Sequence, residues 1–292
     1  MKAYVFPGQG SQYSGMGKEL YESSAIAAEM FEKANEILGF RISDIMFSGT
    51  AEQLRATNVT QPAVFLHSVI LAKVMGIKPD AVAGHSLGEF SALVAAGALS
   101  FEQGLTLVAK RAAAMHKACQ QNEGAMAAVI STDIETIEQI CAQTEGVVVA
   151  ANYNAPGQTV ISGAVDAVKA ACEALKAAGI RRALMLPVGG AFHSPLMESA
   201  RTELEQAIAE VEFSTPICPI YQNVDALPHT DPDQIKANLI KQLTAPVLWS
   251  QSVEKMVMGG VNSFTEVGCG TVLQGLISKT CSEVEVNSVS VI

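Results

Sequence analysis

The sequence predicts an α/β protein with one large domain and a smaller domain inserted into it. Hydrophobic residues make up 49% of the 292 residues and charged residues 16%, a balance that suits buried strands and excludes a disordered chain. Two segments have the pattern strand, glycine-rich turn, helix, and a third region has the pattern β-α-β-β-α-β. The chain is long enough to bury a core in both domains.

The two strand–turn–helix segments indicate a parallel sheet with helices on its faces. In each segment a short apolar strand ends at a glycine-rich turn, and a helix follows. The first has a strand at Ala3–Phe6, a turn at Pro7–Gly17 and a helix from Lys18, and the second has a strand at Asp80–Ala83, a turn at Gly84–Gly88 and a helix at Glu89–Ala98. Both turns can then face one cleft.

Residues 124–187 are predicted to form the inserted domain. Its expected elements are strand Ala125–Ile130, helix Asp133–Gln143, strand Val147–Asn152, strand Thr159–Ser162, helix Val165–Ala178 and strand Arg181–Leu186. This order is typical of the ferredoxin-like arrangement, and the turn Asn154–Gly157 suits the reversal between the middle strands. Residues 1–123 and 188–292 then form the large α/β domain, which ends with helices at Met197–Glu210 and Pro232–Leu243 and a strand at Phe264–Val267.

The second turn contains the strongest candidate for a reactive residue. Gly84–Gly88 has the sequence GHSLG, which matches the G-x-S-x-G elbow, a sharp strand-to-helix turn that exposes a serine hydroxyl. At a helix N-terminus, backbone N–H groups and the helix dipole favour the negative charge that forms when a carbonyl is attacked. The alternative is an ordinary turn. If the turn is such an elbow, Ser86 is the expected nucleophile. The large domain is then expected to be α/β-hydrolase-like, with a short parallel sheet.

A serine nucleophile needs a base within hydrogen-bond reach, and the chain has five histidines. His85 is expected to point away from Ser86, and His67 lies in an apolar helical run that suits a core histidine. His193 lies in the glycine-rich loop Gly189–Pro195, where the chain leaves the inserted domain, and loops at such junctions line clefts. His193 is therefore the candidate base, with a structural loop histidine as the alternative.

The first glycine-rich turn is a candidate for half of an oxyanion hole. Nucleotide binding is not expected, because Met16 stands where the phosphate-loop lysine belongs and Tyr13 where G-x-G-x-x-G needs its third glycine. A backbone N–H of the run Gly8–Gln12 can instead act with the N–H of Leu87, since elbow enzymes pair the residue after the nucleophile with a donor from a separate loop. A plain tight turn is the alternative.

Arg111 is a charged residue in a helical segment otherwise suited to burial. A buried guanidinium needs a carboxylate partner, which its planar fork binds in bidentate fashion. The partner is either a structural acid of the chain, which is the usual case, or a carboxylate of a substrate.

Charge and cysteine content narrow the classes of partner. The formal net charge of -10 argues against nucleic acid, because phosphate binding needs concentrated Lys and Arg. The six cysteines have no C-x-x-C pair and no histidine at metal-ligand spacing, so reduced thiols and no metal site are expected. The first apolar run breaks at Pro7, too early for a signal peptide, and no apolar stretch is long enough to span a bilayer. We expect a cytoplasmic protein that does not bind a membrane.

Several motifs together resemble those of a known family. They occur in order along nearly the whole chain: Phe6–Gln12 (FPGQGSQ), Thr60–Ala63 (TQPA), Gly84–Glu89 (GHSLGE), Arg111, Asn154–Gln158 (NAPGQ), Gly190–Ser194 (GAFHS), Pro246–Trp249 (PVLW) and Glu266–Gly268 (EVG). The chain resembles the malonyl-CoA:acyl carrier protein transacylases of fatty acid synthesis. The number and order of the motifs make chance agreement negligible.

The resemblance implies a two-step acyl transfer. Ser86 would attack the thioester of malonyl-CoA, and the phosphopantetheine thiol of acyl carrier protein would then collect the malonyl group from the serine ester. His193 would act as base and then as acid, oriented by the backbone carbonyl of Leu248 in place of an acidic third residue. The CoA thioester would be a substrate, no cofactor would be needed, and a monomer is expected.

The same resemblance implies roles for further residues. The backbone N–H groups of Gln9 and Leu87 would form the oxyanion hole, and Arg111 would bind the malonyl carboxylate. In the family, a phenylalanine directly before the histidine goes with malonyl rather than methylmalonyl substrates, and steric rejection of one methyl is worth about 1–3 kcal/mol. The other site-lining residues would be Gln61, Asn154 and Phe192.

Two other functions are kept as alternatives. A serine esterase or thioesterase shares the elbow, but Arg111 and the missing acidic triad member count against it. A noncatalytic subunit that binds carrier protein would not need Ser86, His193 and Arg111 together. Two positions depart from the family pattern: Cys269 stands where relatives often have proline, and Leu248 where many have a polar residue.

Overall fold

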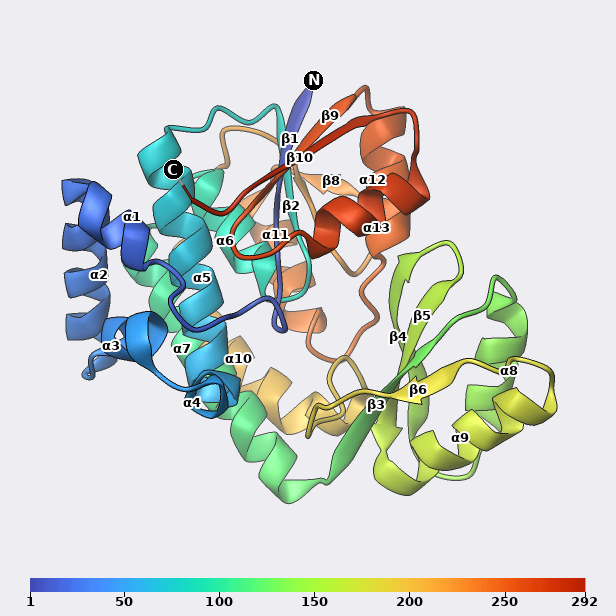
Figure 1. Cartoon of the computed structure of the whole chain (residues 1–292). Coiled ribbons are helices and arrows are strands. Elements are labelled where there is room, and N and C mark those ends of the chain that lie inside the picture. The colour runs from blue at the N-terminus through green and yellow to red at the C-terminus, as the bar shows by residue number, and fades with distance from the viewer. Residues whose placement is uncertain (292) are drawn as a thin grey trace.

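The structure, a computed structural model that describes residues 1–291, is built on two sheets (Figure 1). The strand order of the larger sheet is β10-β9-β1-β2-β7-β8, and its neighbours are parallel except β7 and β8. The strands are β1 (Lys2–Phe6), β2 (Ala81–Gly84), β7 (Ile220–Tyr221), β8 (Pro228–His229), β9 (Ser263–Val267) and β10 (Glu285–Val289). The predicted parallel sheet is therefore confirmed.

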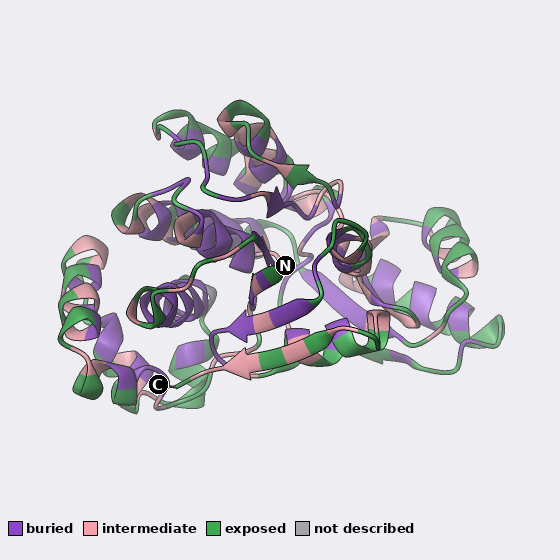
Figure 2. Cartoon of the chain, turned by 90° about the horizontal axis from the view of Figure 1, so that it is seen from above, coloured by how far each residue is buried: buried purple, intermediate pink, exposed green. Residues whose placement is uncertain are grey.

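Helices cover both faces of the larger sheet. They are α1 (Lys18–Ser23), α2 (Ala25–Leu38), α3 (Ile42–Ser48), α4 (Ala51–Arg55), α5 (Thr57–Met75), α6 (Gly88–Ala95), α7 (Phe101–Gln121), α10 (Glu198–Ala209), α11 (Pro232–Lys241), α12 (Trp249–Met258) and α13 (Val272–Thr280), with a 3-10 turn η1 at Pro195–Met197. Side chains alternate along β1 and β2, so Phe6 and Val82 join the core with α5, α6 and α7. Val5 and Ala83 face α12 and α13. Figure 2 shows buried central strands beside the more exposed edge strand β10.

The smaller sheet is antiparallel, in the order β4-β5-β3-β6. Its elements follow the predicted order: β3 (Gly124–Val129), α8 (Ile134–Gln143), β4 (Val148–Ala155), β5 (Gln158–Ala164), α9 (Val165–Ala177) and β6 (Ala183–Met185). One face packs on α8 and α9, and the residues Ala127, Ile161 and Leu175 belong to that core. Met126 and Val160 belong to a separate small cluster with Phe192.

One predicted turn is shorter than expected. The sequence predicts the reversal at Asn154–Gly157, but β4 continues to Ala155, so Asn154 is a strand residue. Register shifts in the β4–β5 pairing, including one between Tyr153 and Ala155, let the strand run on. Gly157, with φ of 78°, makes the turn.

Two backbone hydrogen bonds and one side-chain bond join the smaller sheet to the larger part of the chain. The N–H of Tyr153 donates to the carbonyl of Val247 over 2.9 Å, and the N–H of Val247 donates to Ala151 over 2.8 Å. His85 Nε2 lies 2.8 Å from Oδ1 of Asn154. These bonds hold β4 next to the elbow.

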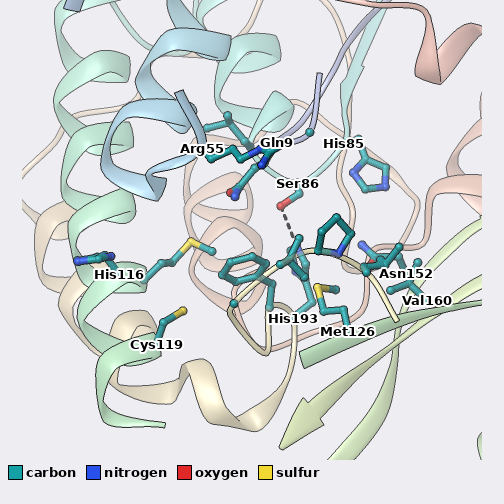
Figure 3. Close-up of a pocket in the computed structure, with 18 of the residues that line it drawn as sticks. Gln9, Arg55, His85, Ser86, His116, Cys119, Met126, Asn152, Val160 and His193 are labelled. Carbon is teal, nitrogen blue, oxygen red and sulfur yellow. Dashed lines mark hydrogen bonds between the residues drawn. The ribbon is translucent and has the colours of Figure 1, made fainter. Parts of the chain in front are cut away.

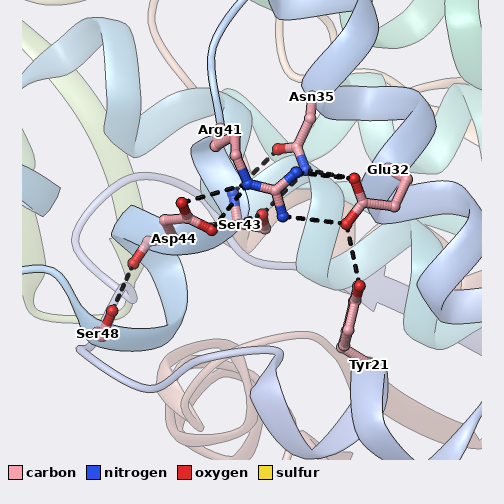
Figure 4. A network of polar contacts seen from close by, with 7 residues as sticks. All are labelled: Tyr21, Glu32, Asn35, Arg41, Ser43, Asp44 and Ser48. Atoms are coloured by element: carbon pink, nitrogen blue, oxygen red, sulfur yellow. Dashed lines mark hydrogen bonds and ion pairs between the residues drawn. The ribbon is translucent and has the colours of Figure 1, made fainter.

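A polar network ties α2 to α3, at the opposite side of the molecule from α8 and α9 (Figures 1 and 4). The guanidinium of Arg41 binds Glu32 and Asp44, and the buried amide of Asn35 donates to Ser43 over 2.9 Å. Arg41 lowers the pKa of Glu32 to about 2. The network stabilises the turn between the two helices.

The described residues include no helix long and apolar enough to cross a bilayer. Over the same residues, no three His, Cys, Asp or Glu side chains are grouped so that they could hold a metal ion.

Candidate active site

Ser86 lies at the sharp turn between β2 and α6, with a φ of 53°. A left-handed backbone at a non-glycine residue costs on the order of 1–3 kcal/mol, so the surrounding contacts must hold it. Glycine is needed on both sides: a Cβ on Gly84 would lie 1.9 Å from the carbonyl carbon of Gly88, and a Cβ on Gly88 would lie 2.0 Å from the carbonyl oxygen of Phe6. The elbow therefore packs directly against the end of β1.

The hydroxyl of Ser86 lies 2.7 Å from Nε2 of His193 (Figure 3). Nδ1 of His193 lies 2.9 Å from the backbone carbonyl of Gln242. A carbonyl can only accept, so the proton is on Nδ1, and Nε2 accepts from the Ser86 hydroxyl. This is the tautomer that a general base requires.

The prediction that Leu248 orients His193 is wrong. The carbonyl of Leu248 is the first acceptor of α12, since both the N–H and the hydroxyl of Ser252 donate to it, over 2.9 and 2.8 Å. It is therefore committed to the helix, and the carbonyl of Gln242 takes the expected place.

His193 is buried, and burial together with the positive charge of Arg111 lowers its pKa from 6.5 to about 3. Burial disfavours the imidazolium first, and the nearby cation adds to the effect. At neutral pH the imidazole is therefore uncharged and can accept a proton.

Arg111 lies 1% exposed on α7 and contacts three side-chain oxygens. Nη1 donates to Oε1 of Gln61 over 2.7 Å, and Nη2 donates to the Ser86 hydroxyl over 3.1 Å and to Oε1 of Gln242 over 3.2 Å. Within residues 1–291 the guanidinium forms no salt bridge with a carboxylate, and its Nε has no hydrogen-bond partner. Burial lowers its pKa to about 10, which leaves it protonated at neutral pH. The neutral side-chain amides of Gln61 and Gln242 thus orient the Arg111 guanidinium but do not neutralise its charge.

Gln9 and Leu87 line the same cleft as Ser86. Gly8 allows the loop after β1 to approach the elbow, because a Cβ there would lie 2.6 Å from the carbonyl oxygen of His85. Of the hydrogen bonds that the described residues form, none has the backbone N–H of Gln9 or of Leu87 as donor. Both groups are free to donate to an anion.

The cleft has a volume of about 670 Å³ and opens between the two sheets. Figure 3 shows Gln9 and Arg55 on one side of Ser86, with Met126, Asn152 and Val160 of the smaller sheet across from them. The cleft is large enough for an extended acyl-thioester arm.

The remaining predicted residues lie as follows. Gln61 holds Arg111, and Phe192 lines the cleft beside His193. Asn154 lines the cleft and contacts His85, which points away from Ser86 as predicted and lies with its ring centroid 5.6 Å from that of Trp249. Cys269 is buried, and burial raises its pKa to about 12, so it is an inert thiol.

Three residues that contact the elbow or support it were not predicted from the sequence. Gln242 bonds to His193, Arg111 and Ser86, and Asn223 binds the backbone of Ser86. Glu89 is fully buried beneath them and accepts the N–H of Asn223. Of the three, only Glu89 has a signal in the sequence, because it is a charged residue in the otherwise apolar helix α6.

Residues 3–292 match the sequence profile of the family described as "Acyl transferase domain".

The chain belongs to this acyltransferase family.

Named relatives agree over nearly the whole length. Malonyl CoA-acyl carrier protein transacylase of Bacillus subtilis (strain 168) is 43% identical over an aligned length of 294, and the match covers 99% of this chain and 93% of that protein. A solved acyl carrier protein S-malonyltransferase from Vibrio cholerae O1 biovar eltor is 42% identical with a TM-score of 0.95, and the match covers 100% of this chain and 97% of that chain. The solved complex PlMCAT:AntF, described as a type II PKS acyl-carrier protein with its malonyl-transacylase, has a TM-score of 0.96 at 37% identity and covers 100% and 96%. The mixed α/β fold with a parallel and a separate antiparallel sheet is thus that of the family.

Proposed function

We propose that the chain transfers the malonyl group of malonyl-CoA to the phosphopantetheine thiol of an acyl carrier protein, through an ester on Ser86. It thereby supplies the extender unit for fatty acid synthesis. The observation that carries the proposal is the contact between Ser86 and Arg111, a buried cation without a carboxylate partner among residues 1–291. The names of the relatives support the same substrates, since one is a malonyl CoA-acyl carrier protein transacylase and another is a malonyl-transacylase bound to its carrier protein.

In the first half-reaction, His193 takes the hydroxyl proton of Ser86 on Nε2 while Oγ attacks the thioester carbonyl. The C–O bond forms, and the carbonyl electrons move onto oxygen. When the tetrahedral intermediate collapses, the C–S bond breaks and the leaving sulfur takes the proton from His193. The result is a malonyl ester on Ser86 and free CoA.

In the second half-reaction, the same groups act in reverse. The carrier-protein thiol gives its proton to His193 and attacks the ester carbonyl through sulfur. Collapse breaks the C–O bond, and Oγ of Ser86 regains the proton. At neutral pH His193 is uncharged, so its Nε2 can accept a proton at the start of each half-reaction.

The free N–H groups of Gln9 and Leu87 are proposed to bind the oxyanion. They flank the nucleophile from two different loops, and neither has a hydrogen bond to another described group. One such donor is worth about 3 kcal/mol of transition-state stabilisation in comparable enzymes. Since the thioester is already activated and the protein supplies nucleophile, base and donors, the proposed reaction needs no cofactor.

Arg111 is proposed to bind the malonyl carboxylate. The guanidinium can donate to two carboxylate oxygens once its contacts to the Gln61 and Gln242 amides rearrange. The carboxylate would neutralise a buried cation, which stabilises the bound substrate relative to an acyl group that lacks it.

A finer description of the architecture is part of the proposal. The strand order β4-β5-β3-β6, with α8 and α9 on one face, supports a ferredoxin-like subdomain at 124–187 inserted into an α/β-hydrolase-like catalytic domain at 1–123 and 188–292. The cleft between the two would then hold the substrate.

Transfer and hydrolysis are separated by one assay. The protein is mixed with malonyl-, methylmalonyl- or acetyl-CoA and carrier protein, and acyl-carrier protein is quantified against free acid. The proposal expects malonyl-carrier protein as the main product. Free malonate as the main product would instead identify a thioesterase, and the absence of either product would favour a noncatalytic binding subunit.

A further inference from the structure

The backbone of Ser86 is held by two amide side chains that come from far along the chain. Oδ1 of Asn223 accepts the N–H of Ser86 over 2.7 Å, and Nε2 of Gln242 donates to the carbonyl of Ser86 over 2.9 Å. These are the two peptide groups that fix φ and ψ of the residue. Because Ser86 has the unfavourable left-handed φ of 53°, its conformation depends on such outside contacts.

Asn223 also reaches the strand side of the elbow. Its Nδ2 donates to the carbonyl of Gly84 over 2.7 Å, so one side chain spans the turn from Gly84 to Ser86. An ionised carboxylate of the same shape could not do this, since one arm must donate and the other must accept. The side chain therefore specifies the conformation of the turn as well as filling space.

Every polar group of Asn223 forms a hydrogen bond, and these bonds fix its position. Its N–H donates to Oε2 of Glu89 over 2.9 Å, and its carbonyl accepts the N–H of Leu248 over 2.9 Å. Glu89 is fully buried, and its other oxygen accepts Nε2 of Gln222 over 2.9 Å. With no freedom to rotate, Asn223 transmits its position to the serine.

We propose that Asn223, anchored on Glu89, is a positioning residue that holds Ser86 in the reactive conformation. It acts through the serine backbone and does not touch the acyl group. By occupying the N–H of Ser86, it also leaves the N–H of the next residue, Leu87, as the elbow's donor to the oxyanion. This inference rests on the proposed role of Ser86 as nucleophile and adds to it a residue that the family motifs do not contain.

The chain offers a matched control in Asn238. This buried amide on α11 donates to Gln222 and to Asp225, so it belongs to the same polar network, but none of its hydrogen bonds reaches the elbow. Asn238→Ala removes a comparable set of bonds without releasing Ser86. A general loss of packing or stability should therefore affect both variants alike.

The test compares Asn223→Ala and the isosteric Asn223→Asp with Asn238→Ala and wild type. The first readout is the rate at which a fluorophosphonate labels Ser86, normalised to the folded fraction from circular dichroism. This probe reports the nucleophile alone and does not depend on malonyl-CoA being the substrate. The second readout is kcat and KM for malonyl-CoA.

We expect both Asn223 variants to label about 100-fold more slowly, the size of effect that a small misplacement of a reacting group produces. The fall should be in kcat, while KM for malonyl-CoA stays near wild type because the Arg111 site is intact. Asn238→Ala should label at the wild-type rate. Wild-type labelling by folded Asn223 variants, or an equal loss in Asn238→Ala, would overturn the inference. If wild type labels but does not turn over malonyl-CoA, the proposed function fails and the labelling comparison still decides the role of Asn223.

Discussion

Nη2 of Arg111 lies 3.1 Å from Oγ of Ser86, so the proposed anion site and the nucleophile are in direct contact. In a malonyl thioester a single methylene separates the carboxylate from the reacting carbonyl. The short distance between cation and nucleophile suits that spacing and does not suit a longer dicarboxylate. This relationship leads to the first prediction.

Replacement of Arg111 by alanine should remove the preference for malonyl over acetyl groups. Truncation of one member of a buried, hydrogen-bonded charge pair costs about 2–5 kcal/mol, so kcat/KM for malonyl-CoA should fall by a factor of about 30 or more. Activity with acetyl-CoA should be unchanged or higher. Arg111→Lys is the matched control, because it keeps the charge but loses the two-pronged contact and should give an intermediate malonyl rate. Equal losses with both acyl groups would mean that Arg111 does not bind the carboxylate.

The pH dependence of acylation should reflect the low pKa of His193. Protonation removes the base, and burial with the Arg111 cation lowers that pKa to about 3. Labelling of Ser86 by a fluorophosphonate should therefore stay level as pH falls through 6.5 and decline only well below it, provided that the fold persists. Arg111→Ala removes the positive neighbour, so its acid limb should lie at higher pH. A wild-type limb near the ordinary 6.5 would contradict this account.

His193 also makes the free energy of unfolding depend on pH. In the unfolded chain a histidine takes up a proton near 6.5, whereas native His193 does not until about pH 3. The unfolded state thus binds more protons in this window, and the free energy of unfolding should fall as pH drops through it. In His193→Gln, urea unfolding measured from pH 7 to pH 4 should show a shallower fall. Identical slopes in the two proteins would argue against a depressed native pKa.

Phe192→Ala should widen the acyl site for methylmalonyl groups. The ring lines the cleft and clusters with Met126 and Val160 of the smaller sheet. Rejection of one methyl is worth about 1–3 kcal/mol, so the ratio of malonyl to methylmalonyl kcat/KM should fall by roughly 10-fold or more. Competition of the two thioesters for one carrier protein measures that ratio. An unchanged ratio would place the selectivity elsewhere in the cleft.

Gln242→Ala should keep the bond from its backbone carbonyl to His193 but lose the side-chain contacts to Arg111 and Ser86. We expect a near-normal imidazole tautomer by ¹⁵N NMR in Gln242→Ala, together with a lower kcat. A wild-type kcat in the folded variant would show that the side-chain contacts of Gln242 are not needed for the reaction.

The sequence predicts well those parts of the fold in which an apolar run meets a glycine. β1, β2, β9 and the four strands of the smaller sheet are of this kind, and their bounds agree within a few residues. β7 and β8 have two residues each, too few for a periodic pattern. β10 is a partly exposed edge strand, so it lacks the apolar run of a buried one. The parallel sheet could be inferred without them.

The residues of the candidate site also differ in how well the sequence predicts them. The sequence does predict Ser86, His193 and Arg111. Each has a reactive or charged side chain in a segment whose fold does not require one. Gln242 and Asn223 act through hydrogen bonds to Ser86, which lies 156 positions from the first and 137 from the second along the chain. Only the fold brings these amides to the elbow, and both lie among other polar residues, so neither is conspicuous in the sequence. The error over Leu248 has the same origin, since helix N-capping geometry decided which carbonyl was free.

The central claim is that Ser86 carries the malonyl group, and intact-protein mass spectrometry tests it most directly. After brief incubation with malonyl-CoA and no carrier protein, wild type should gain the mass of one malonyl group, located to Ser86 by peptide mapping. Holo-carrier protein should then remove it and gain the same mass. Ser86→Ala should show no adduct, with Arg41→Ala, in the distant α2–α3 network, as an active control. A stable malonyl adduct on the Ser86→Ala protein, or transfer of malonyl to carrier protein by that variant, would contradict the account.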